Sequence, residues 1–381
     1  MRTKKIELSI AIITVLLCLF ILKNFLAKLF PISDPYEKWK FITTTNQYIK
    51  SEYPANYSIT TEVETGLPGM DGKSLFSTNN LGFRGDSIVI PKPDNEYRIF
   101  IIGGSTTDNF YLDDSLNINF VLQDYLQVHN SSKYLIKVYN AGKSGDASDD
   151  HISMLVHRII HLNPDMIILF CGINDLTKSI YNFDYLHYIS TESKRISMYK
   201  GLATEFQIPR RLYYLLKRIV PDNKSIVERI TYKSNYKQKV SLTKSYPITT
   251  EKPKLNLSAY RNNLLTIAGI LNSHKTSLLF MTQQTTWDSQ IDNNISDWHW
   301  MTLRNGKRFS EKNLHYAMDT LNNVMREISA SHSVPIYDLA LEIPKTRDYF
   351  YDDVHFNKKG AFISAVDLGN YIIKEKLIKS P

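Results

Sequence analysis

Short apolar runs alternate with segments of helical spacing along most of this chain of 381 residues. Beyond Tyr97 the runs are largely continuous; they are Ile99–Ile102, Leu135–Tyr139, Met166–Phe170, Leu278–Met281 and Pro335–Leu339. Between them, apolar residues recur with helical spacing in Leu116–Val128, Ile152–His161 and Leu314–Ile328. Apolar strands that alternate with helices are typical of a parallel sheet covered on both faces. The pattern therefore predicts a three-layer α/β fold.

The ends of this regular region are predicted from the same pattern. Phe362, Val366, Ile373 and Leu377 are spaced by four, seven and four residues, and we expect them to form the apolar face of a C-terminal helix. Residues 28–97 are mixed in polarity and rich in Pro and Gly turn signals. We expect this lead-in segment to pack on the main domain, which would begin at residue 98.

Charge is concentrated in one segment. The net charge is +8, and residues 177–254 alone contain 16 Lys/Arg and 6 Asp/Glu, so the rest of the chain sums to about −2 (8 − 10). This segment is most of an insertion between the third and fourth apolar runs, which are too far apart for an ordinary crossover. It could face an anionic polysaccharide or lipid, or could be a solvated cap. No RNP or helix-turn-helix pattern accompanies it, so we expect no nucleic-acid partner.

The N-terminus has the charge pattern of a membrane anchor. Residues 1–5 carry three basic side chains and are followed by the uncharged run Leu8–Leu22. A helix over residues 6–27 would be long enough to cross about 30 Å of hydrocarbon. Because basic residues favour the cytoplasmic side, we expect residues 1–5 to be a cytoplasmic tail and the rest of the chain to lie outside the cytoplasm.

A cleaved signal peptide is the alternative to this anchor. Cleavage requires small residues before the cut, and Leu22–Leu26 contains none. Cys18 follows Leu17, where a lipoprotein signal would have a small residue. Lys23 and Lys28 weaken the predicted orientation without reversing it. An uncleaved single-pass anchor is therefore the prediction.

Residues suited to acyl transfer follow the predicted strands. They lie in four blocks, which are Gly103–Thr107, Asn140–Ser148, Gly172–Asp175 and Asp352–His355. Groups at the carboxyl ends of parallel strands meet at one edge of a sheet. Together the blocks supply a hydroxyl nucleophile, an Asp/His pair, a side-chain amide and flexible backbone donors, which are the groups that acyl transfer needs.

The order and spacing of the four blocks resemble those of the SGNH (GDSL) hydrolase family, a group of serine esterases and lipases with a flavodoxin-like sheet. The likeness extends over residues 98–376, and Asn79–Gly85 resembles the lead-in of membrane-anchored members. One departure from the family pattern stands out: the Gly-Asp-Ser-Leu opening is Gly-Gly-Ser-Thr at residues 103–106, so that Gly104 stands where the motif has Asp. That Asp is not part of the triad, so the departure bears on efficiency more than on reaction type.

The resemblance implies a role for five residues. Ser105 would be the nucleophile, His355 the general base and Asp352 the acid that orients the imidazole. The backbone N–H of Ser105, with Gly145 and Asn174, would form the oxyanion hole.

The chemistry of these residues agrees with the implied roles. Ser105 follows two glycines at a strand end, which allows a sharp exit that exposes its hydroxyl. Asp352 lies three residues before His355, so a tight turn brings the carboxylate to the imidazole. Gly145 has no Cβ to keep a substrate oxygen from its N–H. An amide donor such as Asn174 is worth about 3 kcal/mol of the barrier.

Metal and cofactor chemistry fit the sequence less well. His157 and His161 are spaced i, i+4, with His151 nearby, but the Glu of a zinc-protease motif is missing, so we expect solvated helix histidines. Cys18 and Cys171 are too few for a Cys-rich zinc site, and we expect no disulfide between them. We expect neither a metal nor an organic cofactor.

Clues to the substrate come from aromatic residues after the fourth strand. Trp287, Trp298 and Trp300 could stack on a sugar ring or an acyl chain, or could pack in the core. We expect a membrane-anchored serine esterase that hydrolyses an acyl ester, such as acetyl, on a cell-surface carbohydrate. The alternatives are an acyltransferase, a lipase or lysophospholipase, and a catalytically silent glycan-binding protein. The partners would be a small-molecule, glycan or lipid ester and, through the anchor, the membrane.

Overall fold

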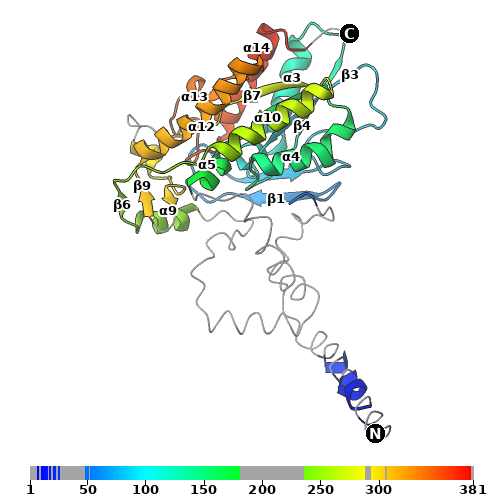
Figure 1. Cartoon of the computed structure of the whole chain (residues 1–381), viewed down its shortest axis with the longest axis vertical. Coiled ribbons are helices and arrows are strands. Elements are labelled where there is room, and N and C mark those ends of the chain that lie inside the picture. The colour runs from blue at the N-terminus through cyan, green and yellow to red at the C-terminus, as the bar shows by residue number, and fades with distance from the viewer. Residues whose placement is uncertain are drawn as a thin grey trace. The chain divides into compact units, whose positions relative to one another are not determined.

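The computed structural model describes residues 48–50, 52–180, 236–287, 293–304 and 307–378, and parts of residues 7–25 (Figure 1). The chain divides into two compact units, of which the first is Met1–Lys40 with Asp184–Arg229. The second is Phe41–Phe183 with Ile230–Pro381, and it contains every strand and helix named below.

A five-stranded sheet forms the centre of the second unit, and all of its strand pairs are parallel. The strands in spatial order are β10 (Ile336–Tyr337), β7 (Ser277–Met281), β5 (Met166–Phe170), β3 (Glu96–Gly103) and β4 (Leu135–Asn140). The five predicted strands are confirmed, although β10 is shorter than expected. Numbered along the chain, the order is 2-1-3-4-5, the flavodoxin-like arrangement, and such sheets bind ligands beside the first strand, where the order reverses.

Helices cover both faces of the sheet, as predicted (Figure 1). Alternate side chains of β3 enter two separate cores, because successive strand residues point to opposite faces. One core is completed by α3 (Ile118–His129) and α14 (Lys358–Lys374), which contact each other. The other is completed by α4 (Ser148–His157), α10 (Ser258–Ser273) and α12 (Glu311–His332).

The second predicted helix, Ile152–His161, is shorter than expected at its carboxyl end. Helix α4 stops at His157, and a 3-10 turn, η3 (Ile159–Leu162), follows it. The turn ends at Asn163 in the left-handed conformation, immediately before a proline. Remaining short helices are η2 (Asp114–Leu116), α2 (Ser105–Asp108), α5 (Ile173–Ile180), α11 (Asn293–Ser296) and α13 (Leu339–Glu342).

The predicted apolar face of the C-terminal helix is correct only in part. Val366, Ile373 and Leu377 are half-buried and pack against the core, as expected. Phe362 is 49% exposed, and Leu377 lies beyond the end of α14. The buried face consists mainly of small residues with two large ones; it is Gly360, Ala361, Ser364, Ala365, Leu368, Gly369 and Ile372. Small side chains let α14 approach α3 closely. Close packing between the two helices therefore decides which face is buried, even though larger apolar residues lie on other faces.

The described part of the lead-in segment, from residue 52 onward, packs on the main domain. Its strands β1 (Ser58–Glu62) and β2 (Lys73–Ser77) form an antiparallel pair. Arg84 is buried, and its guanidinium donates to Asp114 and to the carbonyl oxygens of Asp108 and Leu112.

Most of the basic insertion lies outside the described residues. Its described part contains α9 (Tyr236–Lys244) and β6 (Ile248–Thr249). Strand β6 joins β9 (Lys307–Phe309) and β8 (Leu303–Arg304) in a small separate sheet.

The predicted anchor over residues 6–27 is described only in part. Among the residues that the structure describes, no helix is long and apolar enough to span a membrane.

Candidate active site

Ser105 lies at the carboxyl end of β3, the first strand of the sheet along the chain, and is the first residue of α2. Its Oγ lies 3.0 Å from Nε2 of His355. The other ring nitrogen, Nδ1 of His355, lies 2.8 Å and 3.0 Å from the two carboxylate oxygens of Asp352. The three residues predicted to form the triad are therefore joined by hydrogen bonds from hydroxyl to imidazole to carboxylate.

A tight turn holds Asp352 beside the imidazole. The backbone N–H groups of Val354 and His355 donate to Oδ1 of Asp352 at 3.0 Å and 2.8 Å. The indole N–H of Trp300 donates to its Oδ2 at 3.0 Å. Burial acts to raise the pKa of Asp352, but the charge and hydrogen bond of His355, with the Val354 and Trp300 donors, lower that pKa overall. The carboxylate therefore stays ionised and available to orient the ring.

The two predicted oxyanion donors lie at the ends of the strands that flank β3. Gly145 follows β4, has a φ of +86°, and its carbonyl accepts a hydrogen bond of 2.9 Å from Nζ of Lys50. Asn174 follows β5, and its Nδ2 donates to the carbonyl of Asp146 at 2.8 Å. This bond uses one of the two N–H groups of the Asn174 amide, and the second is left for another acceptor.

Gly104, which stands where the family pattern has Asp, lies close to Asn174. A Cβ at this position would lie 2.6 Å from Nδ2 of Asn174 and 3.1 Å from the carbonyl oxygen of Asp146. Any side chain at position 104 would therefore displace the amide of Asn174. The absence of a side chain at position 104 lets the Asn174 amide lie close to the backbone that precedes Ser105.

The three tryptophans occupy three different environments. Trp287 is 0% exposed, and its indole donates to Asp353 at 2.7 Å, so the predicted substrate contact is wrong for this residue. Its large apolar surface is buried, and its N–H is satisfied inside the protein. Trp300 is half-buried, and its indole is bound to Asp352. Trp298 is half-buried and lines a pocket.

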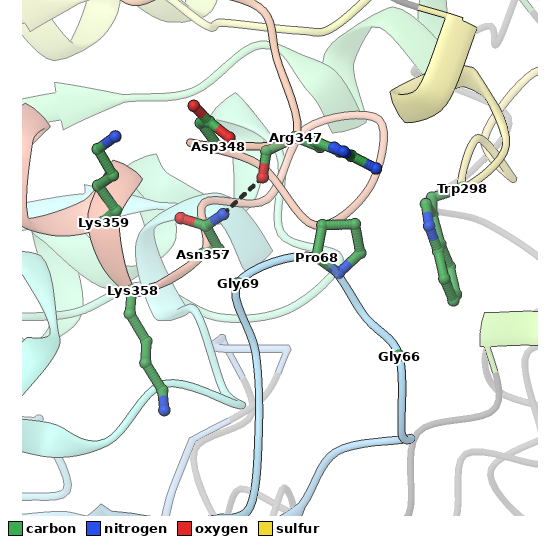
Figure 2. Close-up of a pocket in the computed structure, with 9 residues that line it drawn as sticks. All are labelled: Gly66, Pro68, Gly69, Trp298, Arg347, Asp348, Asn357, Lys358 and Lys359. Carbon is green, nitrogen blue, oxygen red and sulfur yellow. Dashed lines mark hydrogen bonds between the residues drawn. The ribbon is translucent and has the colours of Figure 1, made fainter.

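The pocket lies between the lead-in segment and the start of α14 (Figure 2). Its volume is about 530 Å³, and it is lined by Gly66, Pro68, Gly69, Trp298, Arg347, Asp348, Asn357, Lys358 and Lys359. The Arg347 side chain points toward the side of the pocket on which Trp298 lies. Asn357 is two residues from His355, so their Cα atoms are at most about 7 Å apart. One residue of the pocket wall therefore lies near His355 along the chain, and the wall carries three basic side chains and one acidic side chain.

A buried polar cluster that the sequence did not predict lies at the end of α2, the helix that Ser105 begins. Asp108, at the end of the helix that Ser105 begins, accepts hydrogen bonds from Tyr53 (2.7 Å) and Ser144 (3.0 Å). Burial raises the pKa of Asp108, while Lys143 and Arg84 oppose the shift. Burial also lowers the pKa of Lys143 to about 8. Lys143 lies within the candidate block Asn140–Ser148 and could have been singled out, whereas nothing in the sequence marks Tyr53 in the lead-in segment.

The histidines considered as metal ligands do not gather. His157 and His161 are exposed, and the ring of His157 stacks on Tyr48. His151 is buried rather than solvated, and burial lowers its pKa to about 4. Within the described ranges, no group of three or more His, Cys, Asp or Glu residues is placed to hold a metal ion.

The fold and its strand-end groups define an ester-hydrolysing serine hydrolase. The chain belongs to the GDSL-like lipase/acylhydrolase family, whose model matches residues 99–365. The family predicted from the four blocks is therefore confirmed. No curated protein shows significant sequence similarity to this chain.

Solved structures similar to this chain come from several bacteria. A GDSL-like lipase from Bacteroides thetaiotaomicron is 10% identical, with 76% of this chain and 93% of that chain covered and a TM-score of 0.40. The lipase/acylhydrolase from Enterococcus faecalis is 16% identical, with 73% and 94% covered and a TM-score of 0.39. Axe2, an acetylxylan esterase from Geobacillus stearothermophilus, is 14% identical, with 74% and 96% covered and a TM-score of 0.40.

Proposed function

We propose that this protein is a membrane-anchored esterase that removes a short acyl group, such as acetyl, from a cell-surface carbohydrate, with Ser105 as its nucleophile. The observation that carries the proposal is the continuous hydrogen-bonded path from Ser105 through His355 to Asp352. A buried, ionised carboxylate at one end and a hydroxyl at the other let the imidazole accept and return a proton.

The geometry supports a two-step acyl transfer. Ser105 Oγ attacks the ester carbonyl carbon while its proton moves to Nε2 of His355, and the resulting oxyanion accepts hydrogen bonds from Gly145 and Asn174. The imidazolium then protonates the leaving alkoxide, and the C–O bond of the ester breaks. Water repeats the sequence on the acyl-serine, which releases the carboxylic acid and restores Ser105.

Two features favour a short acyl group on a carbohydrate. Polar side chains lie on both sides of Ser105. The hydroxyl of Thr106, the next residue, donates to Oε1 of Gln283 at 3.3 Å. The amide of Asn174 lies against Gly104, the preceding residue. Such side chains offer a long alkyl chain little apolar surface. The pocket combines an aromatic ring, Trp298, with the guanidinium of Arg347, a pairing that suits a sugar that carries negative charge (Figure 2).

The membrane location belongs to the proposal as well. It is supported by the uncharged N-terminal run, whose described residues are helical and expose their apolar side chains; Ile13, for example, is 64% exposed. The basic residues before this run favour a cytoplasmic N-terminus and a catalytic domain outside the cytoplasm.

Covalent labelling of Ser105 tests the chemistry. We expect a fluorophosphonate probe to label the full-length protein in detergent, and Ser105→Ala to abolish both labelling and ester hydrolysis because no other group can form the acyl intermediate. Ser331→Ala removes a serine on the surface of α12 and should leave both unchanged. Hydrolysis by the Ser105→Ala protein would contradict the proposed mechanism, and absence of labelling in the wild type would favour the silent glycan-binding protein.

A comparison of three substrates tests the substrate class. Acetylated oligosaccharides should be hydrolysed with a higher kcat/KM than p-nitrophenyl acetate, because the sugar can occupy the pocket that Trp298 lines. Lysophospholipid should be a poor substrate, and a preference for it would replace the esterase with the lipase alternative. Transfer of acetyl to an added sugar, in preference to water, would identify an acyltransferase.

A further inference from the structure

The described helix of the basic insertion, α9, packs against Trp300 and Tyr351, two residues that contact the triad. Two side chains of α9, Tyr236 and Lys239, are one turn apart and therefore on the same face. Both contact the ring of Trp300: Nζ of Lys239 lies 4.1 Å from a ring centroid, and the ring of Tyr236 meets it edge-on at 6.3 Å. Nζ of Lys239 also lies 4.8 Å from the ring centroid of Tyr236.

One path of contacts leads from Lys239 to the acid of the triad. The Trp300 ring beneath Lys239 donates its indole N–H to Oδ2 of Asp352 at 3.0 Å. A cation over the face of an indole draws electron density from the ring, and this makes the N–H a stronger donor. The bond to Asp352 is therefore strengthened by a charge that belongs to the insertion.

A second path leads from Tyr236 to the base of the triad. The ring of Tyr236 packs edge-on against Tyr351 at 5.5 Å, and the two hydroxyl groups lie 3.4 Å apart. The Tyr351 ring in turn stacks on the imidazole of His355, with centroids 5.5 Å apart and planes 7° apart. The stack restricts rotation of the imidazole, whose other constraint is its bond to Asp352.

Lys239 is half-buried, so its ammonium is less well hydrated than one at the surface. Burial lowers the pKa of Lys239, and the nearby carboxylates of Asp352 and Asp353 oppose that shift. The ammonium therefore draws its stabilisation from the triad acid and the neighbouring carboxylate. Titratable and charged groups reach Asp352 from several elements; they are His355, Asp353, His299, Tyr351, Tyr236 and Lys239.

We propose that α9 is a positioning element of the active site, in which Lys239 acts through Trp300 on Asp352 and Tyr236 acts through Tyr351 on His355. The inference rests on the proposed roles of Ser105, His355 and Asp352, and it gives the insertion a part in catalysis besides any contact with substrate. Neither α9 residue touches the reacting atoms in this arrangement; each sets the geometry and the charge of a group that does.

Removal of the Lys239 charge is the first test, with acetyl ester hydrolysis as the assay. Lys239→Met should lower kcat about tenfold, because a small misplacement of the triad is costly, and should leave KM within about twofold. Loss of a positive charge near Asp352 and His355 favours the protonated imidazole, so the acid limb of the kcat/KM profile should move about half a pH unit upward. Lys239→Arg should restore both values, because it keeps a cation over Trp300.

Lys237→Met is the matched control. Lys237 is exposed on the same helix, so its replacement removes the same charge from α9 without a contact to Trp300. Wild-type kcat and an unshifted pH profile in Lys239→Met would overturn the proposal, as would an equal effect of Lys237→Met.

Trp300→Phe tests the path itself and does not depend on the folding of the lysine variants. Phenylalanine keeps an aromatic face for Lys239 but has no N–H for Asp352, so the same upward shift of the acid limb is expected. The rate at which the fluorophosphonate labels Ser105 distinguishes failure of the triad assignment from failure of the proposed role of α9. An unlabelled wild type would reject the triad, whereas equal labelling rates in the wild type, Trp300→Phe and Lys239→Met would reject only the role of α9.

Discussion

Gly104 is one of the residues at which the active site departs from the family pattern, and it lies against Asn174. Its φ of −88° is open to any residue, so backbone conformation does not require glycine there. The requirement is space, because Nδ2 of Asn174 lies 2.6 Å from where a Cβ would be. The size of one side chain at position 104 thus controls the placement of an oxyanion donor.

Gly104→Ala tests this dependence. The added methyl should push the Asn174 amide aside and lower kcat about tenfold to hundredfold, with little change in KM. Asn174→Ala removes the donor outright and should lower kcat by about 10²–10³. The measurement is steady-state hydrolysis of an acetyl ester, with fluorophosphonate labelling to show that Ser105 is intact.

The double variant decides whether both changes act on the same donor. If they do, Gly104→Ala combined with Asn174→Ala should be no slower than Asn174→Ala alone, since the displaced group is already absent. Losses that multiply would show instead that the methyl at position 104 disturbs Ser105 itself.

At the level of secondary structure, the contact between α3 and α14 shows why apolar spacing alone found only part of a helix face. Large apolar residues such as Phe362 lie on the outside of α14, while glycines and alanines face α3. A Cβ on Gly369 would lie 2.5 Å from the ring of Tyr125. Close packing of two helices depends on small residues at the crossing, whatever the hydrophobicity elsewhere on the helix.

Two glycine substitutions should therefore have opposite effects on stability. Gly369→Ala should lower the free energy of unfolding by about 1–3 kcal/mol, because the methyl overpacks the contact with Tyr125. Gly269→Ala, at an exposed position of α10, meets nothing within 4 Å and should raise that free energy by up to about 1 kcal/mol through helix propensity. Urea unfolding measures the free energy of unfolding of each variant. A stabilised Gly369→Ala protein would show that α3 and α14 pack less closely than described.

At the scale of the whole molecule, the proposed anchor joins a catalytic domain to a membrane. The described N-terminal residues expose apolar side chains, whereas apolar side chains of the catalytic unit are largely buried in two cores. An exposed apolar helix is unfavourable in water and favourable in lipid.

Fractionation of cells that express the full chain tests the anchor. We expect the protein in the membrane fraction, resistant to carbonate and released by detergent, with a cytoplasmic N-terminus in accessibility labelling. A variant with three charges in the uncharged run, Ile10→Lys, Ile13→Lys and Leu17→Lys, should appear in the soluble fraction and keep its esterase activity. A wild-type product that starts near residue 30 would show that a signal peptide is cleaved instead.

Much of the fold and the central chemistry could be predicted because the relevant signals are local. Each strand of the central sheet is a short apolar run whose position is visible without its neighbours, and all five of these were found, whereas the strands of the two small sheets were not. The Asp352–His355 turn is closed by hydrogen bonds within four consecutive residues, so its sequence alone specifies its geometry. Ser105 follows directly from its place at a strand end. The sequence by itself therefore predicted the layers and, through the family resemblance, the type of sheet and the three residues that the structure joins by hydrogen bonds.

Only the tertiary structure decided what surrounds the triad. Trp287 and Trp300 are alike in sequence, yet one is buried against Asp353 and the other supports Asp352. The contacts of Lys239 and of Tyr53 join segments that are far apart along the chain. Such contacts depend on which faces the folded elements bring together, and on how much space each side chain leaves for the next. These surroundings could not be predicted from the sequence, because side-chain packing depends on many residues at once.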